Sequence, residues 1–235
     1  KFKISKANLL LKRNLNVKKI LLSEKNEIVK IMKFNKTKRL MTVVSEPVLL
    51  KNGNFGLKTY SRLYNKKGEF DYVITKTKQL VKQFPNDPIL YNFIGVCQTK
   101  LNQYKPAIET YKTILKINPV DPDAYFNLGN IFKNCNAFEK AISNYQKALK
   151  LNPMDSGAAN NMGICLQHKG DHKAAVEKYQ MAIEIDPDFA EAYNNLGSSL
   201  ESRGDFQEAV KNYKKASKIN PNYAEAYNNL GSLLK

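Results

Sequence analysis

The sequence contains no tryptophan, three cysteines and two histidines among its 235 residues. An odd number of cysteines without paired spacing argues against a disulfide framework, so we expect a reducing, intracellular and cytoplasmic location. No run approaches the roughly 18 consecutive apolar residues of a membrane-spanning helix, so we expect no membrane partner. No catalytic motif and no phosphate-binding glycine loop is present, and two histidines give general-base catalysis little support. We therefore expect this segment not to be an enzyme and to need no cofactor.

Acidic residues are scarce at the start of the chain. The formal net charge is +17, but residues 1–51 hold 14 Lys and Arg against 3 Asp and Glu, whereas residues 52–235 are only mildly basic. A nucleic-acid interface would therefore lie in this leader, which lacks the interleaved aromatic side chains on which bases stack. We expect residues 1–53 to be a basic leader, partly ordered or capping the following fold with short helices.

What the sequence has in abundance is a spacing of 34 residues. Four columns of identical residues share this interval, and their coincidence predicts a repeat array. The columns are Pro85, Pro119, Pro153, Pro187 and Pro221; Gly95, Gly129, Gly163, Gly197 and Gly231; Ala107, Ala141, Ala175 and Ala209; and Tyr111, Tyr145, Tyr179 and Tyr213.

Each unit reads as two helices. In the unit of residues 190–221, apolar residues at helical spacing predict a first helix that ends at the turn signal Gly204. The second helix carries Tyr213, which we expect to reach the gap between units, and it ends before Pro221 because proline cannot continue a helix. A single hairpin cannot bury its apolar face, so the hairpins are predicted to stack.

The order aromatic, Leu-Gly, aromatic, Ala, aromatic, Ala and Pro resembles the tetratricopeptide-repeat family. The stretch AEAYNNLG is similar to the repeats of O-linked N-acetylglucosamine transferases. The resemblance implies an all-α fold, a right-handed α-solenoid of stacked antiparallel helix hairpins. Ala159 stands where the other full units carry tyrosine, and we predict looser packing there. The units are 54–85 (degenerate), 88–119, 122–153, 156–187, 190–221 and 224–235 (first helix only).

One polar column lies off the core face. With Tyr193 as position 4 of its unit, core positions of the first helix are 4, 7, 8 and 11, and position 6 points away from them. The resemblance implies that first helices line a concave groove, where asparagine can pair with any peptide backbone. The alternative is that these asparagines are idle, exposed positions copied by duplication. The predicted peptide-binding residues are Asn127, Asn161, Asn195, Asn229, Asn130 and Lys133.

Two other sites were weighed against their sequence context. Cys165, His168 and His172 have the spacing C-x2-H-x3-H of zinc ligands, but Cys165 falls next to core positions and His172 falls where phenylalanine packs in neighbouring units, so we predict no metal site. Chaperone-tail binders of this family use a lysine-containing clamp for a terminal carboxylate. The residues at position 5 include no lysine, which argues against such a clamp; they are Asn92, Phe126, Asn160, Asn194 and Asn228.

The sequence therefore favours a protein- or peptide-binding scaffold that holds an extended polypeptide. A first alternative is the substrate-recruiting N-terminal region of a larger glycosyl-, sulfo- or methyltransferase. The start at Lys1 and the stop at Lys235 inside a unit lead us to expect a fragment of a longer protein. A second alternative is nucleic-acid binding through the leader, which would weaken steeply with salt. Self-association through exposed solenoid ends is a further option.

Overall fold

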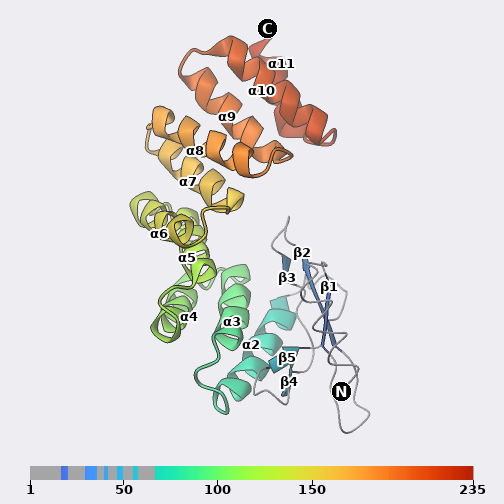
Figure 1. Ribbon diagram of the computed structural model, residues 1–235, viewed down its shortest axis with the longest axis vertical. Coiled ribbons are helices and arrows are strands. Elements are labelled where there is room, and N and C mark those ends of the chain that lie inside the picture. The colour runs from blue at the N-terminus through green and yellow to red at the C-terminus, as the bar shows by residue number, and fades with distance from the viewer. Residues whose placement is uncertain are drawn as a thin grey trace. The chain divides into compact units, whose positions relative to one another are not determined.

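The computed structural model describes residues 67–234 and five short strands that precede them (Figure 1). β1, β2 and β3 form one antiparallel sheet, and β4 pairs antiparallel with β5. The strands are β1 (Val17–Ile20), β2 (Lys30–Asn35), β3 (Leu40–Met41), β4 (Pro47–Leu49) and β5 (Phe55–Leu57).

These strands differ from the short helices expected in the leader. Val17, Ile20 and Ile31 are β-branched, and such residues favour extended backbone. β5 also falls inside the segment assigned to the first helix of a degenerate unit, so the start of that unit at residue 54 stays a prediction. The rest of the leader lies outside the described residues, and its capping role stays a prediction too.

The chain forms two compact units, residues 1–113 and 114–235, and their boundary falls inside α4. From residue 67 on, the described elements are helices. Within residues 122–233 each helix packs on its neighbours in sequence, which confirms the predicted α-solenoid. The helices are α2 (Lys67–Val81), α3 (Pro88–Lys100), α4 (Tyr104–Ile117), α5 (Pro122–Asn134), α6 (Phe138–Leu151), α7 (Ser156–His168), α8 (His172–Ile185), α9 (Ala190–Ser202), α10 (Phe206–Ile219) and α11 (Ala224–Leu233).

Recurring caps and turns delimit these helices. Asp121 and Asp155, 34 residues apart, accept hydrogen bonds from the backbone N–H groups of Ala124 (2.8 Å) and Ala158 (2.9 Å) at the starts of α5 and α7. Such caps satisfy N–H groups that have no partner within the helix. The turn inside each hairpin has one residue with positive φ, where glycine or asparagine is favoured. These turn residues are Asn102, Asn136, Gly170 and Gly204.

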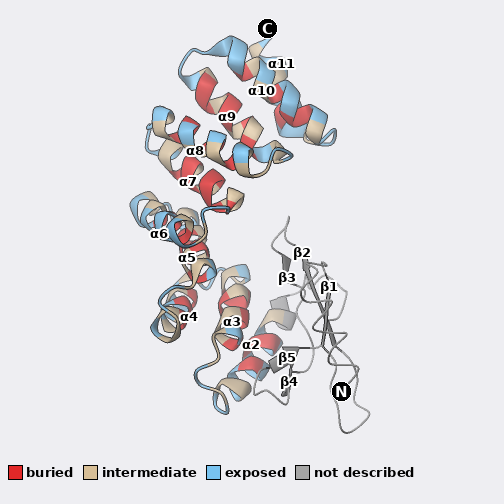
Figure 2. Cartoon of the chain, viewed as in Figure 1, coloured by how far each residue is buried: buried red, intermediate tan, exposed pale blue. Residues whose placement is uncertain are grey.

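The repeated glycines and tyrosines pack on one another within each hairpin. A Cβ atom on Gly197 would lie 2.7 Å from the ring of Tyr213, and one on Gly163 would lie 2.6 Å from the ring of Tyr179. The tyrosine ring therefore packs on the glycine of its own unit. This refines our expectation that Tyr213 reaches the gap between units. Buried residues follow the inner sides of the hairpins (Figure 2).

Ala159, where we predict looser packing, is surrounded by other apolar side chains. Ala159 is fully buried in a cluster with Ala182 and Ala192, against which Met181 packs. In the preceding unit the same two positions hold tyrosine and lysine: the Nζ atom of Lys147 lies 5.4 Å from the ring centroid of Tyr125. Two apolar residues thus replace a cation–π pair, so burial is retained.

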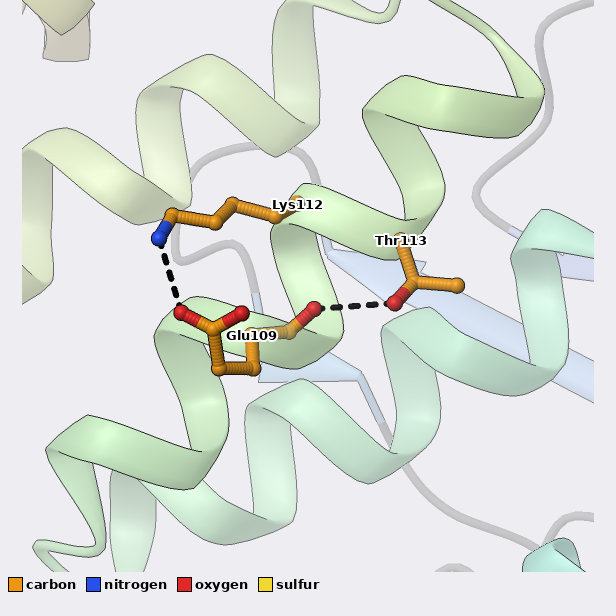
Figure 3. Close-up of polar contacts among 3 residues, drawn as sticks. All are labelled: Glu109, Lys112 and Thr113. Carbon is orange, nitrogen blue, oxygen red and sulfur yellow. Dashed lines mark hydrogen bonds and ion pairs between the residues drawn. The ribbon is translucent and has the colours of Figure 1, made fainter.

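Outward-facing sides of the second helices carry local polar contacts. On α4 the ammonium of Lys112 lies 2.7 Å from a carboxylate oxygen of Glu109, and the Thr113 hydroxyl donates to the Glu109 carbonyl at 2.9 Å (Figure 3). Both members of the ion pair are exposed, and exposed pairs on one helix contribute only about 0.3–0.5 kcal/mol. This side is therefore explained by solvation and needs no ligand.

Candidate polar face

The predicted site residues lie in unit 114–235 and are joined by hydrogen bonds between successive first helices. We call positions 6, 9 and 12 of α5, α7 and α9, together with Asn229 at position 6 of α11, the polar face. Asn161 of α7 donates to the Asn130 side-chain oxygen at 3.0 Å and accepts from the Lys133 ammonium at 2.8 Å. The Tyr145 hydroxyl donates to the same Asn130 oxygen at 2.8 Å. The structure thus brings three predicted residues into direct contact.

The two later asparagines of the column bond differently. Asn195 donates its side-chain amide to the Asn160 oxygen at 3.0 Å, and Asn229 donates to the Asn194 oxygen at 3.0 Å. Asn160 in turn donates to a Glu191 carboxylate oxygen at 3.2 Å. In Asn195 and Asn229 the position-6 amide therefore bonds to position 5 of the preceding unit, which fixes the orientation of these two amides.

Position 5 was missed as a functional position by the sequence analysis. Asn160 and Asn194 are each only 1% exposed, and a buried side-chain amide needs partners because losing its bonds to water is costly. The recurring doublet Asn-Asn at 34-residue spacing was the available signal. These residues clasp successive units together.

Position 12 was recognised at Lys133 but missed in the next two units. The Gln167 oxygen accepts from the Tyr179 hydroxyl at 2.8 Å, and the Gln167 amide donates to the Ser198 hydroxyl at 3.0 Å. In the next unit, Glu201 accepts from the Tyr213 hydroxyl at 2.7 Å. Three long polar residues at the same repeat position were the signal, and all three are half-buried.

Three asparagines of the column bond to a neighbouring unit, and none of the column is fully exposed. Asn127, Asn161 and Asn195 are half-buried, and the column continues at Asn229. Among the described residues Asn127 has no side-chain hydrogen bond, so it remains apart from the other predicted residues. The sequence suggests two roles for these asparagines, contact with a ligand or no role at all. It does not reveal a third role, contact between successive units.

Burial shapes the electrostatics around Lys133. Burial lowers the pKa of its ammonium, while nearby Cys165 and Glu191 raise that pKa. Burial also raises the pKa of the Cys165 thiol to about 11, against a smaller lowering effect of Lys133. Because the thiolate is the nucleophilic form, this cysteine is held in its unreactive state at neutral pH.

The C-x2-H-x3-H residues have packing partners. Cys165 is fully buried, and the His168 ring stacks on Phe138 with centroids 4.9 Å apart. Within the described part of the chain, no group of three or more His, Cys, Asp and Glu side chains could hold a metal ion. The geometry thus gives the cysteine and His168 packing roles.

Comparison with known families bears on this architecture directly. The model described as TPR repeat matches residues 97–134, 166–202 and 199–235, and the model described as Tetratricopeptide repeat matches residues 122–155. Together they span more than half of the chain. This chain belongs to the tetratricopeptide-repeat family. The resemblance seen in the sequence is therefore confirmed.

Solved structures agree with this membership. The crystal structure of MamA is 30% identical, with a TM-score of 0.62 and coverage of 68% of this chain and 93% of that chain. YrrB, described as a TPR protein with an unusual peptide-binding site, is 22% identical, with a TM-score of 0.59 and coverage of 68% and 83%. TTC0263, a thermophilic TPR protein of Thermus thermophilus, is 23% identical, with a TM-score of 0.58 and coverage of 71% and 91%. No curated protein matches the chain.

Tetratricopeptide repeats generally act as non-catalytic scaffolds for protein interaction, and this supports the same broad function here. The helices of the described residues are too short or too polar to cross a membrane. Apart from Ile164, which packs against a buried apolar cluster, the side chains of the polar face are not explained by the apolar core.

Proposed function

We propose that this tetratricopeptide-repeat chain holds an extended polypeptide along its polar face. The observation that carries the proposal is the fixed orientation of the position-6 amides. Asn195 and Asn229 each direct an N–H toward the preceding unit. Their side-chain oxygens accept no hydrogen bond among the described residues, and can therefore accept backbone N–H groups of a ligand.

Repeated acceptors at equivalent positions suit an extended chain better than a compact ligand. An extended polypeptide offers N–H groups at regular intervals along its length, whatever its side chains are. Recognition would then depend on the backbone for affinity and on other residues of the face for selectivity. The three free cysteines support the reducing intracellular compartment that we propose for this interaction.

The proposal can be tested with peptides selected from a random library on the intact chain. Binding of the selected peptides is measured by fluorescence anisotropy to the unmodified chain and to the double variant Asn195→Ala, Asn229→Ala. Because each of the two lost hydrogen bonds contributes about 0.5–1.5 kcal/mol, we expect affinity to fall by about fivefold or more.

The matched control replaces the same residue type on the second helices. Asn144→Ala with Asn212→Ala changes two asparagines that bond to their own helices, on α6 and α10. This control should bind as the unmodified chain does, with folding of both variants checked by circular dichroism. Equal affinity of the two double variants would overturn the proposal.

A further inference from the structure

Position 12 changes charge from one unit to the next along the polar face. It holds a cation at Lys133 on α5, a neutral amide at Gln167 on α7 and an anion at Glu201 on α9. Both α5 and α9 carry an acidic residue at position 2, Asp123 and Glu191, so position 12 is where the charges of the two helices differ.

Each of these side chains is held in place by neutral partners. Lys133 donates to the Asn161 amide oxygen and Glu201 accepts from the Tyr213 hydroxyl. No ion pair among the described residues includes Lys133 or Glu201. Glu191 lies close enough to Lys133 to raise the pKa of its ammonium, but it forms no ion pair with it. A half-buried charge outside an ion pair interacts more strongly with a ligand charge than an exposed one does, because water screens it less.

We propose that Lys133 and Glu201 select the polypeptide by the order of its charges. An acidic ligand residue lies beside Lys133 and a basic one beside Glu201, with uncharged residues facing Gln167 between them. This inference rests on the proposed function and adds the chemical class of its ligand and the order of the ligand charges along the polar face.

The separation of the two ligand charges follows from helix packing. α5 contacts α7, and α7 contacts α9. Packed helices lie about 8–10 Å apart, so two steps span about 16–20 Å. An extended chain advances about 3.3 Å per residue, so the acidic and basic residues should be about five or six residues apart.

The test uses three capped, fluorescent peptides with a common Gly, Ser and Asn background. One has Asp and then Lys at this separation, the second has Lys and then Asp, and the third has Ser at both places. We expect the unmodified chain to bind one charged order at least about threefold more tightly than the other, consistent with partly screened charges. The preference should fade as salt is added.

The decisive variant exchanges the charges, Lys133→Glu with Glu201→Lys, and should reverse the preferred order. Single variants Lys133→Met and Glu201→Gln remove one charge each and should reduce the preference. A control exchange at exposed residues of the second helices, Lys150→Glu with Glu184→Lys, should leave it unchanged.

The outcomes separate this inference from the proposed function. Equal binding of all three peptides would overturn the charge-order inference and leave backbone binding intact. A preference that persists unchanged in the exchange variant would also overturn it. If none of the three peptides binds the unmodified chain, both this inference and the proposed function are wrong.

Discussion

Asn161 and Asn195 occupy the same repeat position, yet they bond to different partners. The first junction, between α5–α6 and α7–α8, has Phe126 at position 5, which lies in a buried cluster with Ala158, Met162 and Cys165 of α7. Asn161 therefore bonds to Asn130 and Lys133. The second junction, between α7–α8 and α9–α10, has Asn160 at position 5, and Asn195 clasps it. Position 5 thus differs between the two junctions: it is aromatic at the first, where Asn161 bonds to positions 9 and 12 instead, and it is a buried amide bonded to Asn195 at the second.

The largest expected effect comes from removing the aromatic ring of the first junction. Phe126 is 7% exposed, so Phe126→Ala should lower the free energy of unfolding by about 3–5 kcal/mol. Urea unfolding measures this. The control Phe206→Ala removes the same side chain where it is 55% exposed and should cost much less. Comparable losses in the two variants would show that the first junction does not depend on packing.

Alkaline pH should weaken the chain through Cys165, which packs at the first junction. Burial raises the pKa of this thiol from 9.0 to about 11. The folded state thus keeps a proton that the unfolded state loses, and the resulting stability is present below pH 9 and lost as pH rises toward 11. Two pKa units correspond to about 2–3 kcal/mol.

The measurement is the free energy of unfolding at neutral pH and near pH 11 for the unmodified chain and for Cys165→Ala. Other buried groups, including Tyr179 with its raised pKa, contribute to the loss in both proteins. The free energy of unfolding falls by some amount between the two pH values in each protein. The difference between these two losses is the contribution of the Cys165 thiol. We expect the smaller loss in the variant, and identical losses would contradict the assigned role of burial.

Removing the buried hydrogen bond between Asn160 and Asn195 tests the second junction. Asn160→Ala removes the acceptor of Asn195 and the donor to Glu191. Unsatisfied buried groups cost about 1–3 kcal/mol, and we expect a loss of that size in urea unfolding. Asn127→Ala, the control without a described side-chain bond, should change stability by about 0.5 kcal/mol or less. A combined Asn160→Ala, Asn195→Ala variant should lose less than the sum of the single losses.

The smallest expected effect is a gain of stability. Ser199 of α9 is fully buried, and its hydroxyl has no hydrogen-bond partner among the described residues. At the same repeat position α5 has Ile131, which is also fully buried. Ser199→Ala removes the cost of burying an unpaired hydroxyl and should raise the free energy of unfolding by about 1 kcal/mol. A loss in urea unfolding would mean that the hydroxyl has a stabilising partner.

The fold could be predicted because its information lies within each unit. The pairing of Gly197 with Tyr213 recurs every 34 residues, and helix boundaries follow from the turn residue Gly204 and from Pro221. These features depend on neighbours in one hairpin, which the period of the sequence reveals directly.

The contacts of the polar face could be predicted only in part. Asn195 and Asn160 are 35 residues apart, and Asn161 and Asn130 are 31 apart. Which of these pairs forms depends on how one hairpin rotates on the next, and the helical pattern of one unit does not contain that rotation. Position 5 was therefore assessed only as a clamp, and its buried bonds were missed.

The central claim is that the side-chain oxygens of the asparagine column accept backbone N–H groups of a bound polypeptide. The most direct test is to methylate the backbone nitrogens of a selected peptide one at a time and measure binding to the unmodified chain and to Asn195→Ala. We predict a loss of about three- to tenfold at particular peptide positions, one of which has no further effect in the variant, because each missing bond costs about 0.5–1.5 kcal/mol. A peptide that tolerates methylation at every position would contradict the claim.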